Sequence, residues 1–395
     1  MNRFGLFLLS AGHLAVDVNP GALPALLPLL FLDMHLSYTT AALVVTVGNV
    51  MSSIVQLLFG VLSDRIRASA GRGWLVPLGC LLASGALALA GQAPSYPLLL
   101  AAVVVSSLGV AVFHPEATRT ANAFAGSRRA TGMALFIVGG NLGFALGPLA
   151  MGALLAAHGR PGALGMLVVA AVAPPVLWLA MRRVAGSAAR ARAAVRGAAG
   201  GTPTRRGALA LLVAVIFFRQ WTQTGLTTFI PLYFVTHLGE PAGVGNELLS
   251  VLLFGSVVGT VLGGTLADRL GRKPVLATSL FVTAPLLLLF LRGGSSGGVA
   301  PLAAAGVVMF MTNSVTVVMG QELLPRSTGL AAGLTIGFAS GLAGLGGALL
   351  GSVADAVGIA ATMQVVCLLP LPGALLSLAL PDTLERAQAV VARTA

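Results

Sequence analysis

The chain has 395 residues, of which 57% are hydrophobic and only 9% are charged. A water-soluble domain carries roughly a quarter of charged residues, so this composition excludes an ordinary soluble protein and indicates a chain that resides in a lipid bilayer. The formal net charge of +12 would suggest a nucleic-acid partner for a soluble protein. We expect no such partner, because the basic residues gather in short segments between long apolar runs.

Twelve long apolar runs predict twelve membrane-spanning helices, because a charge at the centre of a bilayer costs at least a few kcal/mol. The predicted spans are 4–31, 38–63, 74–91, 96–124, 130–157, 161–181, 208–235, 248–267, 274–291, 299–324, 328–354 and 358–380. The first begins after a basic residue, as a signal peptide does. Its internal His13 and Asp17, and the lack of a small-residue cleavage site, predict an uncleaved span instead.

A segment rich in arginine, alanine, glycine and serine separates the sixth span from the seventh and is typical of a solvated basic linker. We expect an all-α membrane protein with a six-helix bundle over 1–183, this linker over 184–207, and a second six-helix bundle with a short tail over 208–395. Most of the 23 basic residues fall in loops on the linker's side of the membrane. By the positive-inside rule that side is the cytoplasm, and both termini lie there.

The two halves repeat short motifs at offsets of 197 to 204 residues. Gly60-Val-Leu-Ser-Asp64-Arg65 returns as Gly264-Thr-Leu-Ala-Asp268-Arg269, and Arg129-Ala-Thr-Gly132 returns as Arg326-Ser-Thr-Gly329. Such repeats predict two bundles related by an axis along the membrane normal. Transporters built in this way place their binding sites at the interface between the repeats.

The first of these repeats, followed by Gly71-Arg72 or Gly271-Arg272-Lys273, resembles the A motif of the major facilitator superfamily, and the chain resembles that superfamily over its whole length. Further pieces are similar to the fosmidomycin-resistance branch: Gly12-His13-Leu14-x-x-Asp17, Phe113-His114-Pro115-Glu116-Ala117-x-Arg119, Gly139-Gly140-Asn141-x-Gly143 and Gln321-Glu322-Leu323-Leu324-Pro325. The chain departs from the family by four extra residues in the first A motif, and by Arg219 where the family usually has lysine.

The resemblance implies a monomeric, multi-pass exporter of the bacterial inner membrane, in particular a proton-coupled antiporter of small drugs or metabolites. It implies no enzymatic activity and no cofactor beyond the proton gradient. It also implies gating roles for the charged residues of the two A motifs, Asp64, Arg65, Arg72, Asp268, Arg269 and Arg272. Gly143, Gly147 and Pro148 resemble the antiporter C motif, which indicates either a gate or ordinary packing of small residues.

Charged residues inside the spans carry the chemistry that we expect. Asp17 and Arg219 lie at comparable depths in the first and seventh spans, and aligning these spans on a shared proline places the two residues on opposite sides of one cavity. Asp17 is either a proton carrier or half of a structural ion pair. His13 lies one turn before Asp17 on the same helical face, where it would relay a proton or fill a packing position. Arg219 stays protonated, so it suits recognition of a carboxylate or phosphonate rather than proton transfer.

Glu116 and Arg119 are three residues apart on one span and are expected to pair, either in the substrate cavity or as a latch near the inner mouth. His114 precedes Pro115, and would either carry a proton or close a hydrogen bond to a freed backbone carbonyl. The remaining candidates are polar or aromatic side chains that would contact the substrate, namely Gln220, Trp221, Gln223, Asn141 and Asn313.

These residues together predict alternating access. Asp17 or Glu116 takes a proton on the outside and releases it inside, and a small anionic or zwitterionic compound then binds at Arg219 and Arg119. A symporter that imports a small organic anion would use the same charges. A membrane enzyme or sensor would need a nucleophile or metal cluster, whereas the five histidines are scattered along the chain. A channel fits the two-half repeat less well than a moving interface does.

Overall fold

The structure is a computed structural model that describes residues 2–65, 74–125, 129–194, 206–324 and 333–382. Every regular element in these ranges is helical. Ten of the described helices are long and apolar enough to cross a membrane, and Leu75–Ala90 and Gly341–Val357 are shorter apolar helices. The chain divides into two compact units. The first unit comprises Met1–Ala198 and Pro231–Ser250, and the second unit comprises Ala199–Ile230 and Val251–Ala395.

Up to residue 194, the described part of the first unit forms six α-helices and one short 3₁₀ helix. Their bounds are α1 Arg3–Asp33, α2 Tyr38–Arg65, α3 Leu75–Ala90, α4 Tyr96–Ala125, α5 Arg129–His158, η2 Arg160–Met166 and α6 Leu167–Ala194. The α6 helix continues through residues 184–194, so the first part of the predicted linker 184–207 is helical, and the bounds of the linker stay a prediction. This segment is rich in alanine and arginine, both strong helix formers, which explains why it extends the helix.

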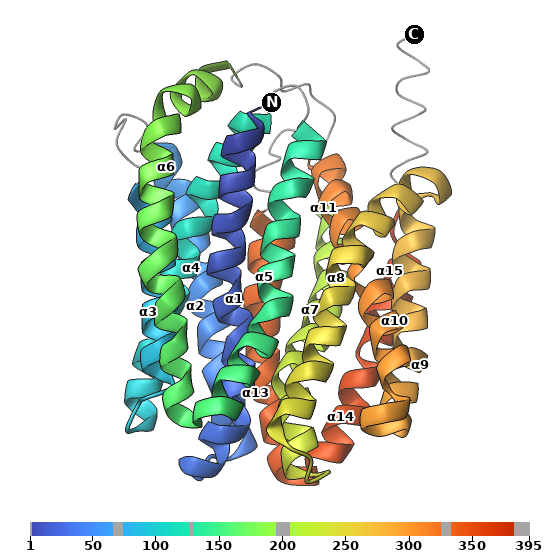
Figure 1. Ribbon diagram of the computed structural model, residues 1–395. Helices are drawn as coiled ribbons and strands as arrows, with labels where there is room; N and C mark the ends of the chain where they lie inside the picture. The colour runs from blue at the N-terminus through green and yellow to red at the C-terminus, as the bar shows by residue number, and fades with distance from the viewer. Residues whose placement is uncertain (1, 66–73, 126–128, 195–205, 325–332, 383–395) are drawn as a thin grey trace. The chain divides into compact units, whose positions relative to one another are not determined.

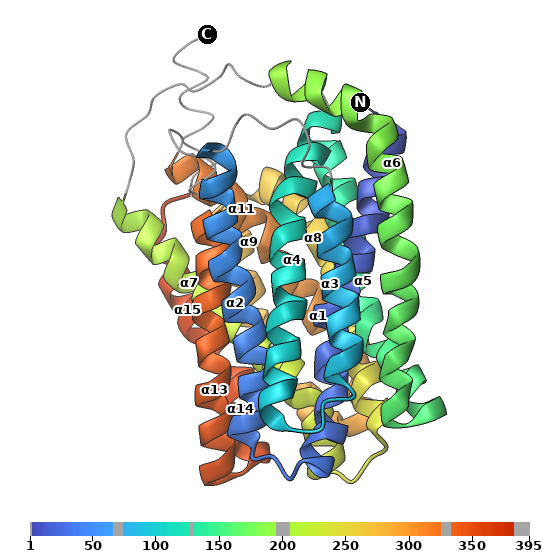
Figure 2. The ribbon, with the colours of Figure 1, turned by 90° about the vertical axis from the view of Figure 1, so that its left-hand side faces the viewer.

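Close contact between α1 and α5 forms the centre of the first unit, and the two helices lie side by side in Figure 1. Glycines make this approach possible: a methyl group at Gly139, Gly143 or Gly147 would collide with the backbone of α1. The α4 helix lies between α2 and α3 and also contacts α1 (Figure 2). Large buried side chains such as Phe113 and Phe136 fill the space among these helices. Polar side chains of α1 and α4 are thereby held at fixed positions inside an apolar bundle.

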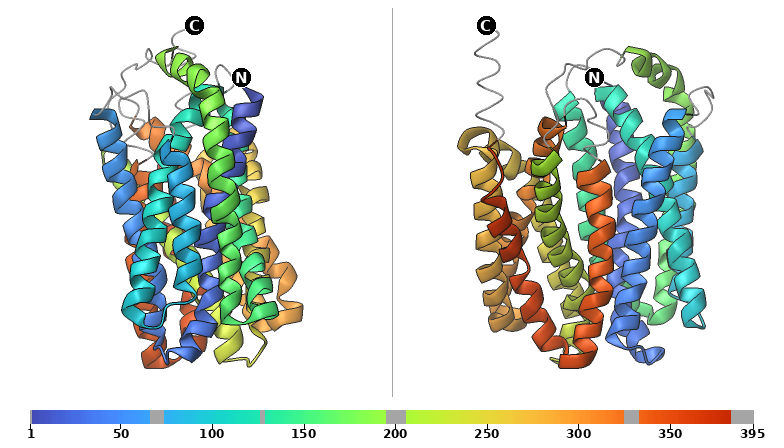
Figure 3. Two further views of the ribbon diagram at one scale, coloured as in Figure 1. Left: turned by 60° about the vertical axis from the view of Figure 1, so that its left-hand side comes forward. Right: turned by 180° about the vertical axis from the view of Figure 1, so that it is seen from behind.

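The second unit is built from more broken helices. Their bounds are α7 Arg206–Thr236, α8 Ala242–Leu270, α9 Arg272–Gly297, α10 Val299–Phe310, α11 Thr312–Leu323, η4 Gly333–Phe338, α13 Ala339–Val357, α14 Ile359–Leu368 and α15 Pro370–Ser377. The last parts of α7 and the first part of α8 belong to the first unit. The α9 helix packs against α10 and α15, and α9 and α15 are side by side in the right-hand view of Figure 3.

Two predicted spans of the second unit are interrupted rather than continuous. The span 299–324 divides into α10 and α11 at Met311, whose N–H is shared between the carbonyls of Val307 and Val308. The span 358–380 divides into α14 and α15 at Leu369, where Pro370 has no N–H to continue the helical hydrogen bonds. The span 328–354 is described from residue 333, and its first part is the π-helix η4. Hydrophobicity alone does not predict local interruptions of this kind.

Candidate functional site

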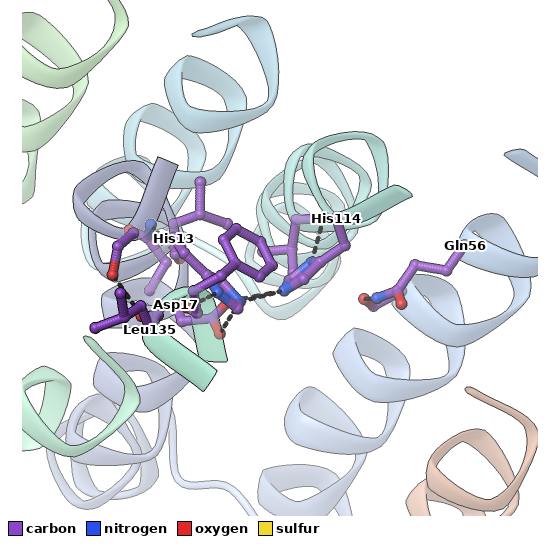
Figure 4. Close-up of polar contacts among 11 residues, drawn as sticks. His13, Asp17, Gln56, His114 and Leu135 are labelled. Carbon is purple, nitrogen blue, oxygen red and sulfur yellow. Dashed lines mark hydrogen bonds and ion pairs between the residues drawn. The ribbon is translucent and has the colours of Figure 1, made fainter. Parts of the chain in front are cut away.

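Three titratable side chains of the first unit converge on one point (Figure 4). The Nε2 atom of His13 lies 3.1 Å from Oδ2 of Asp17, and the Nε2 atom of His114 lies 3.2 Å from Oδ1 of the same carboxyl group. The two Nε2 atoms are themselves 3.2 Å apart. His13 and Asp17 lie one turn apart on α1, and His114 reaches them from α4. We refer to these three residues as the His–Asp–His cluster.

The hydrogen bond made by Nδ1 of each imidazole ring fixes the tautomer of that ring. The Nδ1 atom of His13 lies 2.8 Å from the carbonyl oxygen of Phe136, and that of His114 lies 2.8 Å from the carbonyl oxygen of Val110. A carbonyl oxygen only accepts hydrogen bonds, so each Nδ1 must carry a hydrogen and donate it. In a neutral ring the Nε2 atom is then a bare acceptor. Both acceptors point at an acidic group and at one another.

This arrangement needs at least one further proton. With both rings neutral and Asp17 ionised, two nitrogen lone pairs and a carboxylate would face each other at about 3 Å without a hydrogen between them. One proton on either Nε2 turns a repulsive contact into a charge-assisted hydrogen bond to the carboxylate. A second proton gives each carboxylate oxygen its own imidazolium donor. The geometry therefore accommodates a change of one proton without moving any of the three side chains.

Residues around the cluster hold it in place. Phe136 of α5 stacks on the His13 ring with ring centroids 4.1 Å apart, in addition to accepting its hydrogen bond. Gly140, one turn further along α5, leaves the space that the cluster occupies: a Cβ atom there would lie 2.5 Å from Nε2 of His13 and 2.7 Å from Oδ2 of Asp17. In the sequence, Gly140 stands out only as part of a family motif. Its role depends on the packing of α5 against α1, which the sequence does not display.

The cluster is only partly shielded from solvent. The side chains of His13, Asp17 and His114 are 9%, 18% and 22% exposed. The ligand atoms of the three residues lie within 4.8 Å of one another, which also leaves room for a metal ion, so experiments on the cluster require a chelator.

The sequence predicted two possible roles for His114, and its ring contacts a backbone carbonyl and Asp17 at once. Pro115 lacks the N–H that would donate to the carbonyl of Ala111. His114 contacts the carbonyl of Val110 and not that of Ala111.

Glu116 and Arg119 occupy successive turns of α4, with Oε2 of Glu116 3.7 Å from Nη1 of Arg119. The carboxyl group is buried, whereas the guanidinium is about one third exposed. The expected pairing of these residues is therefore present in the geometry. Whether the pair lines the substrate cavity or latches the inner mouth stays a prediction.

Arg219 is a buried cation of the second unit, with 5% of its surface exposed. Its Nη1 donates to Oε1 of Gln223 at 3.3 Å, and its Nη2 donates to Oε1 of Gln220. Both partners are neutral amides, and Nε has no acceptor among the described residues. No carboxylate among the described residues of this unit pairs with Arg219. A buried guanidinium in this condition favours binding of an anion, because burying an uncompensated charge is costly.

The other predicted contact residues have varied surroundings. Trp221 packs against Phe217 with ring centroids 5.2 Å apart, and its indole Nε1 is buried close to Gly346 without an acceptor among the described residues. Asn141 of α5 follows Gly140 and has a buried amide nitrogen that finds no acceptor there either. Asn313 stands near the start of α11, where its carbonyl accepts a hydrogen bond from Thr316. Asp17 and Arg219 belong to different units, so the cavity that they would share stays a prediction.

The structure describes some of the predicted gating residues and not others. In the second A motif, Nη2 of Arg272 lies 2.9 Å from Oε1 of Glu322 and 4.0 Å from Oδ1 of Asp268, so it ties the start of α9 to the end of α11. Asp268 is largely exposed, as is Arg269. Asp64 and Arg65 end α2, and Arg72 lies outside the described residues. Gly143 and Gly147 contact the backbone of α1, and Pro148 is buried beside them in α5.

Known proteins match this chain in sequence and in fold. The family model of the Major Facilitator Superfamily matches residues 9–348. The chain is 33% identical over 380 residues to an uncharacterized MFS-type transporter of Bacillus subtilis (strain 168), YfnC, covering 94% of this chain and 91% of that protein. It is 29% identical over 384 residues to the fosmidomycin resistance protein of Escherichia coli (strain K12), covering 96% and 93% of the two chains.

Solved structures agree at the level of the fold. A bacterial homologue of the human lysosomal transporter Spinster, in an inward-facing and unoccupied conformation, has a TM-score of 0.74 at 15% identity and covers 95% of this chain and 96% of its own. The nucleoside transporter NupG, in a mutant form, has a TM-score of 0.74 at 13% identity and covers 96% and 100%. The sequence and structure matches confirm the predicted all-helical membrane fold and the resemblance to the fosmidomycin-resistance branch.

Proposed function

We propose a specific activity for this chain, which belongs to the Major Facilitator Superfamily of transporters: it exports a small anionic or zwitterionic compound in exchange for protons. The chain is a multi-pass membrane transporter and not an enzyme. The proposal goes beyond family membership in three respects, namely the coupling to protons, the anionic group of the substrate and the direction of transport. We also propose that the chain works as a monomer in the bacterial inner membrane, with both termini in the cytoplasm, as the distribution of basic residues favours.

The convergence of two acceptor nitrogens on one carboxyl group carries the proposal of proton coupling. The His–Asp–His cluster must hold at least one proton and accommodates a second without rearrangement. Imidazole is the side chain whose charge changes most readily between about pH 5 and 8, the range in which a bacterial proton gradient operates. Ionisable groups inside a membrane segment are costly to retain and mark proton or substrate paths. The cluster is accordingly the proposed carrier of the exchanged proton, with Glu116 as a further proton-binding group on α4.

Arg219 supports the proposal of an anionic substrate group. Its guanidinium is buried, lacks a carboxylate partner among the described residues of its unit, and retains a free Nε donor there. Guanidinium presents parallel donors that match a carboxylate or phosphonate in a bidentate contact. Gln220 and Gln223 hold the guanidinium through its Nη atoms. This leaves the Nε edge for the ligand, and Arg119 would provide a second positive charge.

Coupling follows if proton and substrate occupy different conformations. In this proposal the outward-facing conformation takes the additional proton at the cluster, and the inward-facing conformation releases it and then binds the substrate anion at Arg219. Substrate binding and proton loss then favour each other, a reciprocal coupling between two sites. Export rather than import is favoured by the resemblance to a protein named for drug resistance. Proton-driven import of the same anion is the competing assignment.

The direct test uses purified protein in proteoliposomes with an imposed proton gradient and EDTA on both sides. The Asp17→Asn variant removes the carboxylate of the cluster and should abolish gradient-driven substrate movement while leaving substrate binding intact. Asp33→Asn is the matched control, because Asp33 lies at the end of α1, is about two-fifths exposed and pairs with Arg160. Gradient-driven flux of Asp17→Asn equal to that of the parent would remove the basis of the proposal. In inverted vesicles export appears as net uptake into the lumen, so net efflux of preloaded substrate would favour import.

A further inference from the structure

A small cavity lies inside the first unit, among α1, α2, α3 and α4. Its volume is about 70 Å³, enough for at least two water molecules at the roughly 30 Å³ that each occupies in the liquid. Five polar side chains line it from α1, α2 and α4, namely Asn19, Asn49, Ser52, Ser106 and Ser107, and apolar residues form the rest of its wall. The polar side chains are uncharged donors and acceptors, so they suit water rather than an ion.

Asn19 is held beside the cavity by its amide nitrogen. The side chain is 1% exposed, and its Nδ2 donates to the hydroxyl of Ser84 at 3.0 Å and to the carbonyl of Val16 at 2.9 Å. Its Oδ1 is buried and has no donor among the described residues. Asn49, Ser52 and Ser107 are the other polar side chains that water in the cavity would contact.

The cavity adjoins the His–Asp–His cluster through Val110, and the three cluster residues themselves do not line it. Val110 lines it, and the carbonyl of Val110 accepts the hydrogen bond from Nδ1 of His114. Asn19 lies two residues beyond Asp17 on α1, toward the end of the helix at Asp33. The lining residues of the other helices, such as Val45 of α2 and Leu87 of α3, also extend toward that end of the bundle. The cavity therefore lies between the cluster and the end of the unit opposite the N-terminus.

We infer that this cavity holds a chain of hydrogen-bonded water molecules and is the route by which protons reach the cluster from the outer side of the membrane. The inference rests on the proposed function, because it assigns a path to the proton that the cluster exchanges. Asn49, Ser52 and Ser107 offer this water hydrogen-bonding partners on α2 and α4. Blocking the cavity should slow the arrival of protons and leave the handling of substrate unchanged.

Gly48 offers a clean way to fill the cavity. It lines the cavity, and a Cβ atom at this position would lie 3.2 Å from Oγ of Ser107 and 3.4 Å from Cγ1 of Val103, a tight but tolerable fit. Gly48→Ala therefore puts a methyl group where water is proposed, and Ser107→Val removes the facing hydroxyl. Gly85→Ala is the matched control, because a Cβ atom there meets nothing within 4 Å.

Two readouts in proteoliposomes with EDTA separate the proton path from the rest of transport. Gradient-driven flux in Gly48→Ala and Ser107→Val should fall by about fivefold or more, the factor expected from the loss of one hydrogen-bonded link. Counterflow of labelled substrate without a gradient should match that of the parent and of Gly85→Ala. The inference is overturned if gradient-driven flux is unchanged, or if flux and counterflow fall together, because the latter would indicate a general defect in transport.

A labelling experiment tests the water independently of proton coupling. In Ser107→Cys, a small water-soluble thiol reagent should modify one cysteine, whereas Cys80 and Cys367 are buried and should remain unmodified as they do in the parent. Absence of reaction at position 107 would contradict a hydrated cavity. A parent protein that shows no gradient-driven flux would instead reject the proposed function, and labelling would then still decide whether the cavity contains water.

Discussion

Gly140 of α5 stands directly against Asp17 of α1, so close that a Cβ atom on the glycine would lie 2.7 Å from Oδ2 of the carboxyl group. The same atom would lie 2.5 Å from Nε2 of His13. No side chain other than hydrogen fits this position without displacing the cluster. The backbone of α5 thus determines where the two α1 side chains meet His114.

The first prediction concerns this contact. Gly140→Ala should displace His13 from Asp17 and reduce gradient-driven transport by about a hundredfold, the lower range expected when a positioned proton-transfer group is lost. Substrate binding in the absence of a gradient should change little, because Arg219 lies on α7. Gly85→Ala again serves as the control. Full gradient-driven transport in Gly140→Ala would mean that the cluster tolerates displacement and is not the proton site.

The second prediction concerns pH. Transport by the parent should change with pH between about 5 and 8, because imidazole is the side chain whose charge changes most readily in that range. His114→Gln keeps a hydrogen-bonding side chain but cannot take a proton, so its flux should be low and nearly independent of pH in that range. Cys80 of α3, Glu116 of α4 and His158 of α5 are other titratable groups on helices packed against α1, so they are the alternative sources of a pH dependence.

His158→Gln is the control for this experiment, because His158 stands at the end of α5, far along the chain from Phe136 and Gly140. Its pH profile should match that of the parent. If the His114→Gln variant instead retained the parent profile and Glu116→Gln lost it, the coupled proton would be assigned to Glu116. A profile unchanged in every variant would reject both residues.

The third prediction concerns the anion. Arg219→Gln should weaken binding of the substrate by about 10- to 100-fold, as expected for the loss of a charge-assisted hydrogen bond. Arg219→Lys should weaken it less, because lysine keeps the charge but loses the bidentate geometry. Binding is measured on purified protein across a panel of phosphonates, carboxylates and cationic drugs. Stronger binding of cations by Arg219→Gln, with no loss of anion binding, would place the anion site elsewhere.

The fourth prediction concerns the ion pair that joins α9 to α11. Arg272 is 8% exposed and donates to Glu322 at 2.9 Å, so removal of the carboxylate leaves a largely buried guanidinium without its main partner. Glu322→Gln should lower the free energy of unfolding by roughly 1.5–3 kcal/mol. The measurement is thermal unfolding in detergent with a double-mutant cycle that adds Arg272→Gln. Additive effects of the two substitutions would show that the pair contributes no coupling energy.

Most of the helical framework was predictable from the sequence. Uncharged apolar runs predicted α1, α2, α4 and α5 to within a few residues, because the cost of charges inside lipid restricts the sequence strongly. The breaks at Met311 and Leu369 and the extension of α6 to Ala194 were not predicted. These features depend on local hydrogen bonding and on helix propensity, and hydrophobicity does not report either.

The candidate site was predictable only along single helices. Spacing of four residues predicted that His13 and Asp17 share one face of α1, and spacing of three predicted the contact between Glu116 and Arg119. The contact from His114 to Asp17 joins residues 97 positions apart and requires α4 to pack against α1 in a particular register. The contributions of Gly140 and the Phe136 carbonyl depend on α5 in the same way.

The central claim is that the His–Asp–His cluster binds the proton that is exchanged for substrate. Its most direct test is the number of protons released when substrate binds to purified protein in weakly buffered detergent near pH 7 with EDTA, followed with a pH indicator. The account predicts release of about one proton per chain from the parent and none from Asp17→Asn under conditions where both bind substrate. Equal proton release from the parent and from Asp17→Asn would contradict it.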